Sequence, residues 1–213
     1  MKLQAEHLKL YAVTDRSWLG GCTLAQQVEE SLAGGATMVQ LREKGMDRET
    51  LRWEALEIRA VCRRYGVPFL INDAADLAAE VGADGVHVGQ SDIVDKDVRA
   101  MIGPDKILGI SANTVETAVK AQESGADYIG VGAVFHTDTK KDAQSLTNEE
   151  LLAICKAVTI PVVAIGGINE NNIMQLKGSG IDGVSVISAI FAKEHPGEAT
   201  KVLLKKVEEM LGE

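Results

Sequence analysis

Two acidic residues are the groups in this sequence best placed to hold a metal ion. Asp73 follows the apolar run 69–71, and Asp92 follows a second apolar run that ends at Gly89. The segment between the runs is Ala-rich and helical, so the crossover makes the two strands parallel. Both carboxylates then lie at the carboxyl edge of one sheet, where ligands of parallel α/β folds bind. Such a pair suits a hard cation such as Mg²⁺ that bridges to a phosphate.

Asp73 also has a simpler interpretation, because an Asp in front of a helix commonly caps its N-terminus. The following helix would begin at Ala74. Asp92 favours the metal site over the cap, since the same place on the next strand is also acidic.

Residues 39–44, Val-Gln-Leu-Arg-Glu-Lys, carry polar side chains at alternate positions. Side chains alternate across a strand, so Val39 and Leu41 face the covering helices and the polar set points into the sheet's open edge. That set is Gln40, Arg42 and Lys44. A planar guanidinium and an ammonium point charge suit a diphosphate. For Lys44 a solvated strand end is equally open, and Glu43 either orients a neighbour or faces water.

Small and hydroxylated residues after the last strands predict a second anion site. Gly166-Gly167 follow an expected strand, and Ile187-Ser188 stand where a helix begins after the next one. These two loops and a helix N-terminus form the recurrent phosphate site of α/β barrels, although Gly167 could also serve only a tight turn. The loop 132–140 carries hydroxyls and an ammonium that could hold phosphate, and loops of this size are also often merely variable.

The elements that position these groups alternate regularly along the chain. Strands are expected at 8–13, 37–41, 69–71, up to 89, 107–110, 128–131, 161–165 and 183–186. Helices are expected at 24–33, 48–65, 74–81, 93–101, 115–124, 148–158, 171–177 and 188–211, the last with a break near Pro196. Eight such units predict a single-domain (β/α)₈ barrel over residues 1–213, with a doubly wound open sheet as the rival.

A repeated tripeptide supports the barrel. Gly82-Ala83-Asp84, Gly125-Ala126-Asp127 and Gly180-Ile181-Asp182 each stand between a helix and a strand, and Gly34-Gly35-Ala36 is a looser copy. The copies recur roughly every 43–55 residues, about two βα units. We expect them on the face opposite the active site, as devices for stability.

Composition narrows the class of protein. The chain has 213 residues and a net charge of −9, which argues against broad binding of nucleic acid. Its three cysteines are widely spaced, so neither a zinc site nor a disulfide framework is expected. No signal peptide and no membrane span is recognised, and a cytoplasmic enzyme acting on small phosphorylated molecules is the expectation. A homo-oligomer is left open.

With these residues in place, the sequence resembles the thiamine phosphate synthase family. The matching segments run in order along nearly the whole chain: 11–15, 39–44, 71–73, 85–90 with Asp92, Ser111, 137–140, 165–167 and 186–188. The resemblance implies a transferase of thiamine biosynthesis. Such an enzyme couples a hydroxymethylpyrimidine diphosphate to a thiazole phosphate or its carboxylated form, releases diphosphate and requires one Mg²⁺ per site.

The resemblance also implies roles for individual residues. The pyrimidine diphosphate would be held by Gln40, Leu41, Arg42, Glu43, Lys44, Asn72, Ser111 and Lys140. The thiazole phosphate would be held by Thr137, Asp138, Thr139, Gly167, Ile187 and Ser188. Asp73 and Asp92 would hold the metal. The family mechanism is dissociative, with Arg42, Lys44 and Lys140 stabilising the departing diphosphate and Asn72 orienting the pyrimidine.

One loop departs from the family pattern. The family usually has Gly-Pro-Ile-Phe-Pro-Thr where residues 132–137 read Gly-Ala-Val-Phe-His-Thr. Without the two prolines this loop is expected to be less rigid, which concerns the thiazole half of the site. A thiazole phosphate tautomerase of the sister family and a non-catalytic phosphate-binding barrel are the alternatives. Retention of both aspartates and of the basic row argues against the tautomerase.

Overall fold

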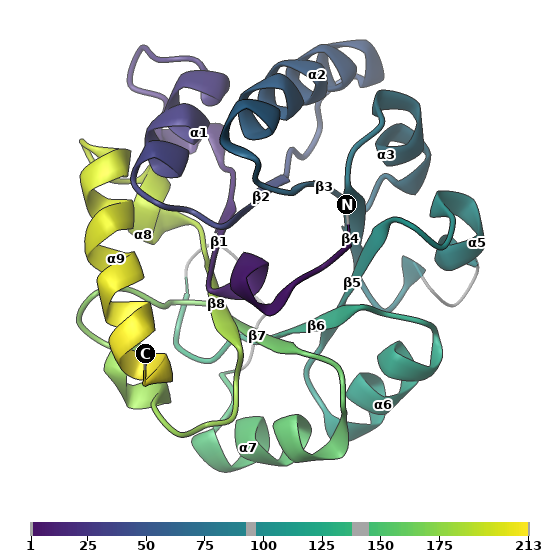
Figure 1. The fold of residues 1–213 in the computed structure, drawn as a ribbon, viewed down its shortest axis with the longest axis vertical. Helices are drawn as coiled ribbons and strands as arrows, with labels where there is room; N and C mark the ends of the chain where they lie inside the picture. Colours follow the sequence, from purple (N-terminus) through teal and green to yellow (C-terminus); the bar gives the residue numbers. More distant parts are fainter. Residues whose placement is uncertain (1, 93–96, 138–144, 213) are drawn as a thin grey trace.

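Eight parallel strands close into a barrel with helices on its outside (Figure 1). The structure is a computed structural model and describes residues 2–92, 97–137 and 145–212. The strands are β1 Leu10–Val13, β2 Met38–Leu41, β3 Phe69–Asn72, β4 Gly85–Val88, β5 Ile107–Ala112, β6 Tyr128–Val131, β7 Val162–Ile165 and β8 Gly183–Val186. Each strand pairs with its neighbour in sequence, and β8 pairs with β1. The predicted (β/α)₈ barrel is confirmed.

The helices lie between the strands in sequence and surround the barrel. They are α1 Leu24–Ala33, α2 Arg48–Tyr65, α3 Ala75–Val81, α5 Val98–Ile102, α6 Val115–Glu123, α7 Asn148–Ala157, α8 Ser188–Phe191 and α9 Pro196–Leu211, with 3₁₀ turns η1 Ala5–Leu8, η2 Arg16–Trp18 and η3 Ile173–Leu176. None of the helices in the described part of the chain is long and apolar enough to cross a membrane.

Two apolar layers hold the barrel together. The larger one lies between the strands and the surrounding helices and contains alternate strand residues such as Val39, Leu41 and Ile71. The smaller one contains strand residues of the opposite parity, among them Tyr11 and Tyr128, and forms the interior of the barrel. This division follows from the alternation of side chains along each strand.

The repeated tripeptide ties the strands together in pairs. Asp84, Asp127 and Asp182 each accept a hydrogen bond from a backbone N–H at the start of the preceding strand, at 3.1, 2.7 and 2.8 Å. Directly after the looser copy, Thr37 Oγ1 accepts a hydrogen bond from the Leu10 N–H at 2.9 Å. The same device therefore links β1 to β2, β3 to β4, β5 to β6 and β7 to β8. This location, where strands begin, agrees with the predicted role in stability.

One local prediction needs correction, and a second is described only in part. The segment expected as a helix at 171–177 is only the 3₁₀ turn η3, because the Asn169 and Asn172 amides donate to the Gly167 carbonyl and hold the chain in a loop. Of the helix expected at 93–101, the described part contains α5 at Val98–Ile102, with Asp97 as its N-cap. Residues 93–96 lie outside the described part.

Candidate active site

The two acidic residues stand at neighbouring strand ends. Asp73 directly follows β3, and its backbone N–H donates to the His87 carbonyl of β4 at 2.9 Å. Its φ of 62° is unusual for a residue other than glycine, and backbone conformations of this kind cluster at functional sites. The cap of α3 is Ala74, without a side-chain hydrogen bond, so Asp73 does not act as the N-cap. Its carboxylate instead accepts a hydrogen bond of 2.6 Å from Asn72 Nδ2.

The charges around Asp73 show that the acidic and basic groups converge. Partial loss of hydration at the barrel mouth raises the pKa of the Asp73 carboxyl, and the negative charge of Asp92 raises it further. The Asn72 hydrogen bond and the charges of Arg42 and Lys44 lower the same pKa. Asp92, Arg42 and Lys44, from the loops after β4 and β2, therefore all act on the charge of Asp73, and the four residues form one electrostatic cluster around it.

The basic row is divided between strand and loop. Gln40 is the only one of the three in β2, and its buried amide donates to the hydroxyl of Tyr11 inside the barrel. Arg42 and Lys44 lie beyond Leu41, where the strand has ended, so strand alternation does not orient them. The Arg42 backbone N–H donates to Thr14 Oγ1 at 3.0 Å, which fixes the start of this loop against the end of β1.

Two residues predicted for the pyrimidine diphosphate have their side chains engaged elsewhere. Leu41 is buried in the layer beneath the helices. Glu43 accepts a hydrogen bond of 2.6 Å from Arg16 Nε, and the same guanidinium binds Glu54 of α2 at 2.7 Å. Glu43 therefore orients the loop after β2 through Oε2, while its buried Oε1 has no hydrogen-bond partner among the described residues; a contact of Leu41 with a ligand would run through the backbone.

Ser111 is linked to the rest of the barrel interior. It lies in β5, and its hydroxyl is 3.0 Å from Nε2 of His87. The other ring nitrogen of His87 lies 2.8 Å from the Tyr128 hydroxyl. Tyr128 was not singled out from the sequence, because an aromatic residue in a strand looks like ordinary core.

Residues predicted for the second anion site line one narrow pocket. Its walls come from the loops after β6, β7 and β8 and contain Thr137, Gly167, Ile187 and Ser188. The loop after β6 is held beside β7 by backbone hydrogen bonds of 3.0 Å from Val134 to Ile165 and from Phe135 to Gly166. These bonds provide order in a loop where the family prolines are missing.

Ser185 is a further polar residue of this pocket, and its role is not predicted from the sequence. It belongs to β8, is 3% exposed, and its hydroxyl has no hydrogen-bond partner among the described residues. A buried hydroxyl without a partner is costly, so a ligand or water that bonds to it is favoured. A serine within an apolar strand was the available signal.

Three predicted residues lie outside the part of the chain that the structure describes. They are Asp138, Thr139 and Lys140. Among the described residues, no group of three or more His, Cys, Asp or Glu side chains could hold a metal ion.

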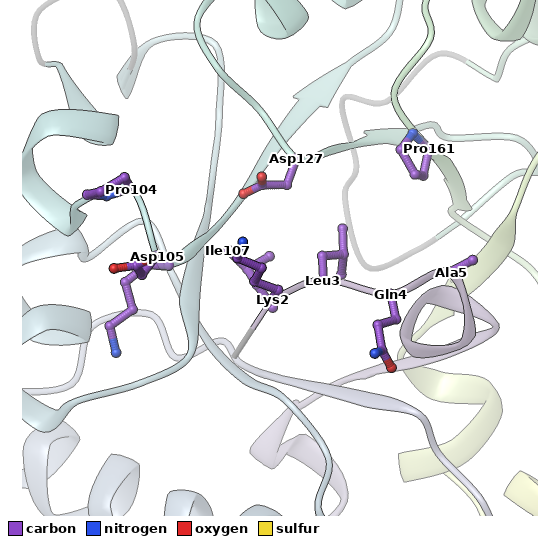
Figure 2. Close-up of a pocket in the computed structure, with 10 residues that line it drawn as sticks. Lys2, Leu3, Gln4, Ala5, Pro104, Asp105, Ile107, Asp127 and Pro161 are labelled. Atoms are coloured by element: carbon purple, nitrogen blue, oxygen red, sulfur yellow. The ribbon is translucent and has the colours of Figure 1, made fainter.

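A larger cavity than the pocket after β6, β7 and β8 lies at the other end of the barrel. It has a volume of about 430 Å³ and is lined by the N-terminal segment 2–5 and by residues that precede β5, β6 and β7 (Figure 2). Asp105, Asp127 and Pro161 surround it. This is the face where strands begin, which in barrels of this kind serves stability, whereas ligands bind at the opposite face.

The fold and the site define a (β/α)₈ barrel with acidic and basic groups gathered where the strands end. A solved structure of KGPDC from Streptococcus mutans shares this fold alone, with a TM-score of 0.67, 13% identity and coverage of 96% of this chain and 100% of that one. Residues 10–190 match the model of the family described as thiamine monophosphate synthase, and the chain belongs to that family.

Individual relatives agree with this assignment. The thiamine-phosphate synthase of Clostridium tetani is 51% identical over 194 residues, which cover 91% of this chain and 93% of the relative. That of Methanobrevibacter smithii is 50% identical over 199 residues, 93% and 95% of the two chains. The thiamine phosphate pyrophosphorylase of Pyrococcus furiosus superposes with a TM-score of 0.88, 40% identity and coverage of 98% and 99%. The resemblance to this enzyme family, predicted from motifs, is confirmed.

Proposed function

We propose that the chain is a thiamine phosphate synthase that condenses a hydroxymethylpyrimidine diphosphate with a thiazole phosphate. The observation that carries the proposal is the cluster at the ends of β2, β3 and β4. There Asp73 senses the charges of Asp92, Arg42 and Lys44 at once. A cluster of carboxylates and cationic side chains suits a diphosphate leaving group with its metal ion, because the carboxylates can bind the metal and the cations can bind the diphosphate.

The acidic pair fits Mg²⁺. Its donors are carboxylate oxygens, which this ion prefers, and the repulsion that raises the pKa of Asp73 is relieved when a cation lies between the charges. Two protein carboxylates are enough, because Mg²⁺ usually takes its other ligands from phosphates and water. When bound at Asp73 and Asp92, the ion would neutralise charge on the diphosphate.

The side chains of the cluster then support a dissociative reaction. The bond between the pyrimidine methylene carbon and the diphosphate oxygen breaks, and the electron pair leaves with the diphosphate. Arg42 and Lys44 stabilise the charge that develops on the leaving group. The lone pair of the thiazole nitrogen then forms the new bond to the methylene carbon. Asn72, held against Asp73, orients the pyrimidine in this step.

The pocket after β6, β7 and β8 holds the thiazole phosphate. Gly167 allows a close approach of the backbone, and Ile187 and Ser188 offer N–H groups at the start of α8. The carbonyl of Gly167 accepts hydrogen bonds of 2.8 Å from Asn172 and 3.2 Å from Asn169, which keep this loop in place. The two substrates would meet between this pocket and the charged cluster.

The test is an assay of the purified, folded protein with both substrates, with and without Mg²⁺. Thiamine phosphate and diphosphate should form in equal amounts, and only when Mg²⁺ is present. Absence of thiamine phosphate from folded protein would reject the proposal. Conversion of the thiazole phosphate alone without Mg²⁺ would identify a tautomerase instead, and binding without turnover a non-catalytic barrel.

A further inference from the structure

A chain of hydrogen bonds crosses the interior of the barrel and ends at two residues of the proposed pyrimidine site. It starts at Gln40 of β2, whose amide donates to the Tyr11 hydroxyl of β1. The Tyr128 hydroxyl of β6 donates to the same Tyr11 oxygen at 3.1 Å. His87 of β4 continues it, with 2.8 Å from Nδ1 to the Tyr128 hydroxyl and 3.0 Å from Nε2 to the Ser111 hydroxyl.

The barrel has space for these hydrogen-bonded side chains because two inward-facing positions are glycine. A Cβ on Gly109 would lie 2.2 Å from Cζ of Tyr128 and 2.5 Å from Nδ1 of His87. A Cβ on Gly130 would lie 2.9 Å from Cε1 of His87. The usual barrel interior is filled by bulky branched side chains, so room for a histidine and a phenol here is a local property of β5 and β6.

The chain also explains why three polar rings occur in a core. Tyr11 and Tyr128 are 1% and 0% exposed, and burial raises the pKa of both phenols, which keeps them neutral. The two tyrosine rings meet edge to face at 6.0 Å, and His87 lies 5.6 Å from Tyr128. Apolar residues would stabilise this core without the need to satisfy hydroxyls, so the hydroxyls point to a role beyond packing.

We propose that Tyr11, Tyr128 and His87 are positioning residues that hold Gln40 and Ser111 as one unit for the pyrimidine diphosphate. Gln40 and Ser111 lie on β2 and β5, two strands that are not neighbours, and the chain is their connection. Without it, each side chain could leave its binding rotamer independently. The inference rests on the proposed function, and it assigns a task to three residues that do not themselves touch the reacting atoms.

The experiment uses paired substitutions at His87. His87→Asn keeps a polar atom near the position of Nδ1, facing Tyr128, and loses the contact with Ser111. His87→Gln places its polar atom near the position of Nε2 and keeps that contact. We expect His87→Asn to raise the KM for the pyrimidine diphosphate about tenfold, with the KM for the thiazole phosphate within about twofold of wild type. His87→Gln should restore most of the loss.

Tyr128→Phe removes the central hydroxyl and keeps the ring. It should raise the same KM about tenfold, whereas Tyr65→Phe, at an exposed tyrosine of α2, should change neither KM. The double variant His87→Asn/Ser111→Ala should be no worse than Ser111→Ala alone, because both changes remove the same contact. Calorimetric binding of the pyrimidine diphosphate with Mg²⁺, in the absence of the thiazole, should reproduce the order of the variants.

Three outcomes would overturn the inference. They are equal changes in the KM of both substrates, a loss of thermal stability with unchanged KM, and additive effects of His87→Asn and Ser111→Ala. A wild-type protein that forms no thiamine phosphate would reject the proposed function instead. The two failures are therefore distinguishable.

Discussion

The two sides of the barrel mouth are built from different chemistry. Beyond β2, β3 and β4, long charged side chains gather, and Asp73 interacts with Asp92, Arg42 and Lys44. Beyond β6, β7 and β8, the pocket is lined by uncharged residues, namely glycines, hydroxyl residues and branched aliphatic residues, with Gly167 among them. In the proposed function, the first side binds its substrate through charges at a distance, and the second side binds its substrate through close contact.

This difference predicts how each side tolerates change. Charged groups on flexible side chains can adjust by an ångström, so what matters there is the number and sign of charges. Backbone N–H groups cannot adjust in that way, and an added methyl group can close the pocket. Substitutions that alter charge should therefore change the kinetic constants for the pyrimidine diphosphate. Substitutions that fill the pocket should change those for the thiazole phosphate.

The largest effect is expected from Asp92→Asn. The substitution keeps the size of the side chain and removes one of the two charges of the proposed metal site. We expect kcat to fall about 1,000-fold, because removal of one electrostatic group from a catalytic site typically costs a factor of this order. The Mg²⁺ concentration that gives the half-maximal rate should rise. The measurement is the initial rate as a function of Mg²⁺ concentration.

Asp105→Asn is the matched control, because Asp105 lines the cavity at the opposite end of the barrel. It should leave the rate and the Mg²⁺ dependence unchanged. An Asp92→Asn protein with the wild-type dependence on Mg²⁺ would show that the acidic pair does not hold the metal.

The second effect tests the close-contact side through Gly167→Ala. Gly167 has a φ of +68°, and a Cβ there would lie 2.3 Å from the His136 carbonyl oxygen. The loops must separate to admit it, so kcat/KM for the thiazole phosphate should fall about 100-fold, with little change in binding of the pyrimidine diphosphate. Steady-state kinetics with each substrate varied in turn would measure this.

Gly178→Ala is the control that separates the effect of backbone strain from the effect of a blocked pocket. Gly178 also has a positive φ, +80°, but nothing lies within 4 Å of an added Cβ. This control should lose stability by about 1 kcal/mol and keep its kinetic constants. Equal kinetic losses in both variants would show that backbone strain, not the closed pocket, impairs the enzyme.

The fold could be predicted in detail because its signals are local and repeated. The strands 128–131 and 183–186 and the helix 48–65 have the predicted bounds, and the Thr147–Glu150 capping box is present. The helix predicted at 171–177 is wrong because the Asn169 and Asn172 side chains bond to the nearby Gly167 carbonyl, a local side-chain effect that hydrophobic periodicity does not record. The described residues predicted for the two anion sites lie at or beyond the carboxyl ends of their strands, since parallel strands end together, and their binding roles stay predictions.

The site was predicted unevenly, for a physical reason. Charges such as Arg42 and Asp92 stand out in a sequence because they are rarely buried without purpose. Tyr11 and Tyr128 resemble ordinary core residues in the sequence. Only the hydrogen bond between their hydroxyls, which joins residues 117 positions apart, points to a shared role. Glu43 could not be assigned because its partner, Arg16, belongs to a different loop.

A smaller effect is expected from Arg42→Lys, which keeps the charge and removes the planar fork. The KM for the pyrimidine diphosphate should rise about tenfold, and that for the thiazole phosphate should stay constant. Arg52→Lys on α2, where the side chain binds Glu80 at the surface, is the matched control and should have no kinetic effect. A rise in the thiazole KM alone would contradict the division of the mouth into two sides.

The smallest effect concerns stability at Asp73. Because its pKa is raised in the folded protein, ionisation of Asp73 costs stability, and this cost grows as pH rises from about 4 through the folded-state pKa. Asp73→Asn removes the charge and suits the φ of 62°. In metal-free protein we expect Tm at pH 7 to rise by about 1–2 °C, while activity falls.

Asp76, in the first turn of α3, supplies the opposite case. Arg48 and backbone hydrogen bonds lower the pKa of Asp76, so its contribution to stability is present above about pH 4 and is lost as pH falls through the folded-state pKa. Asp76→Asn should therefore lower Tm slightly at pH 7. Thermal melts from pH 3.5 to 8 in chelator measure both variants. If Asp73→Asn also lowers Tm at pH 7, the repulsion at the charged side is not a cost to the folded state, and Mg²⁺ has no repulsion to relieve.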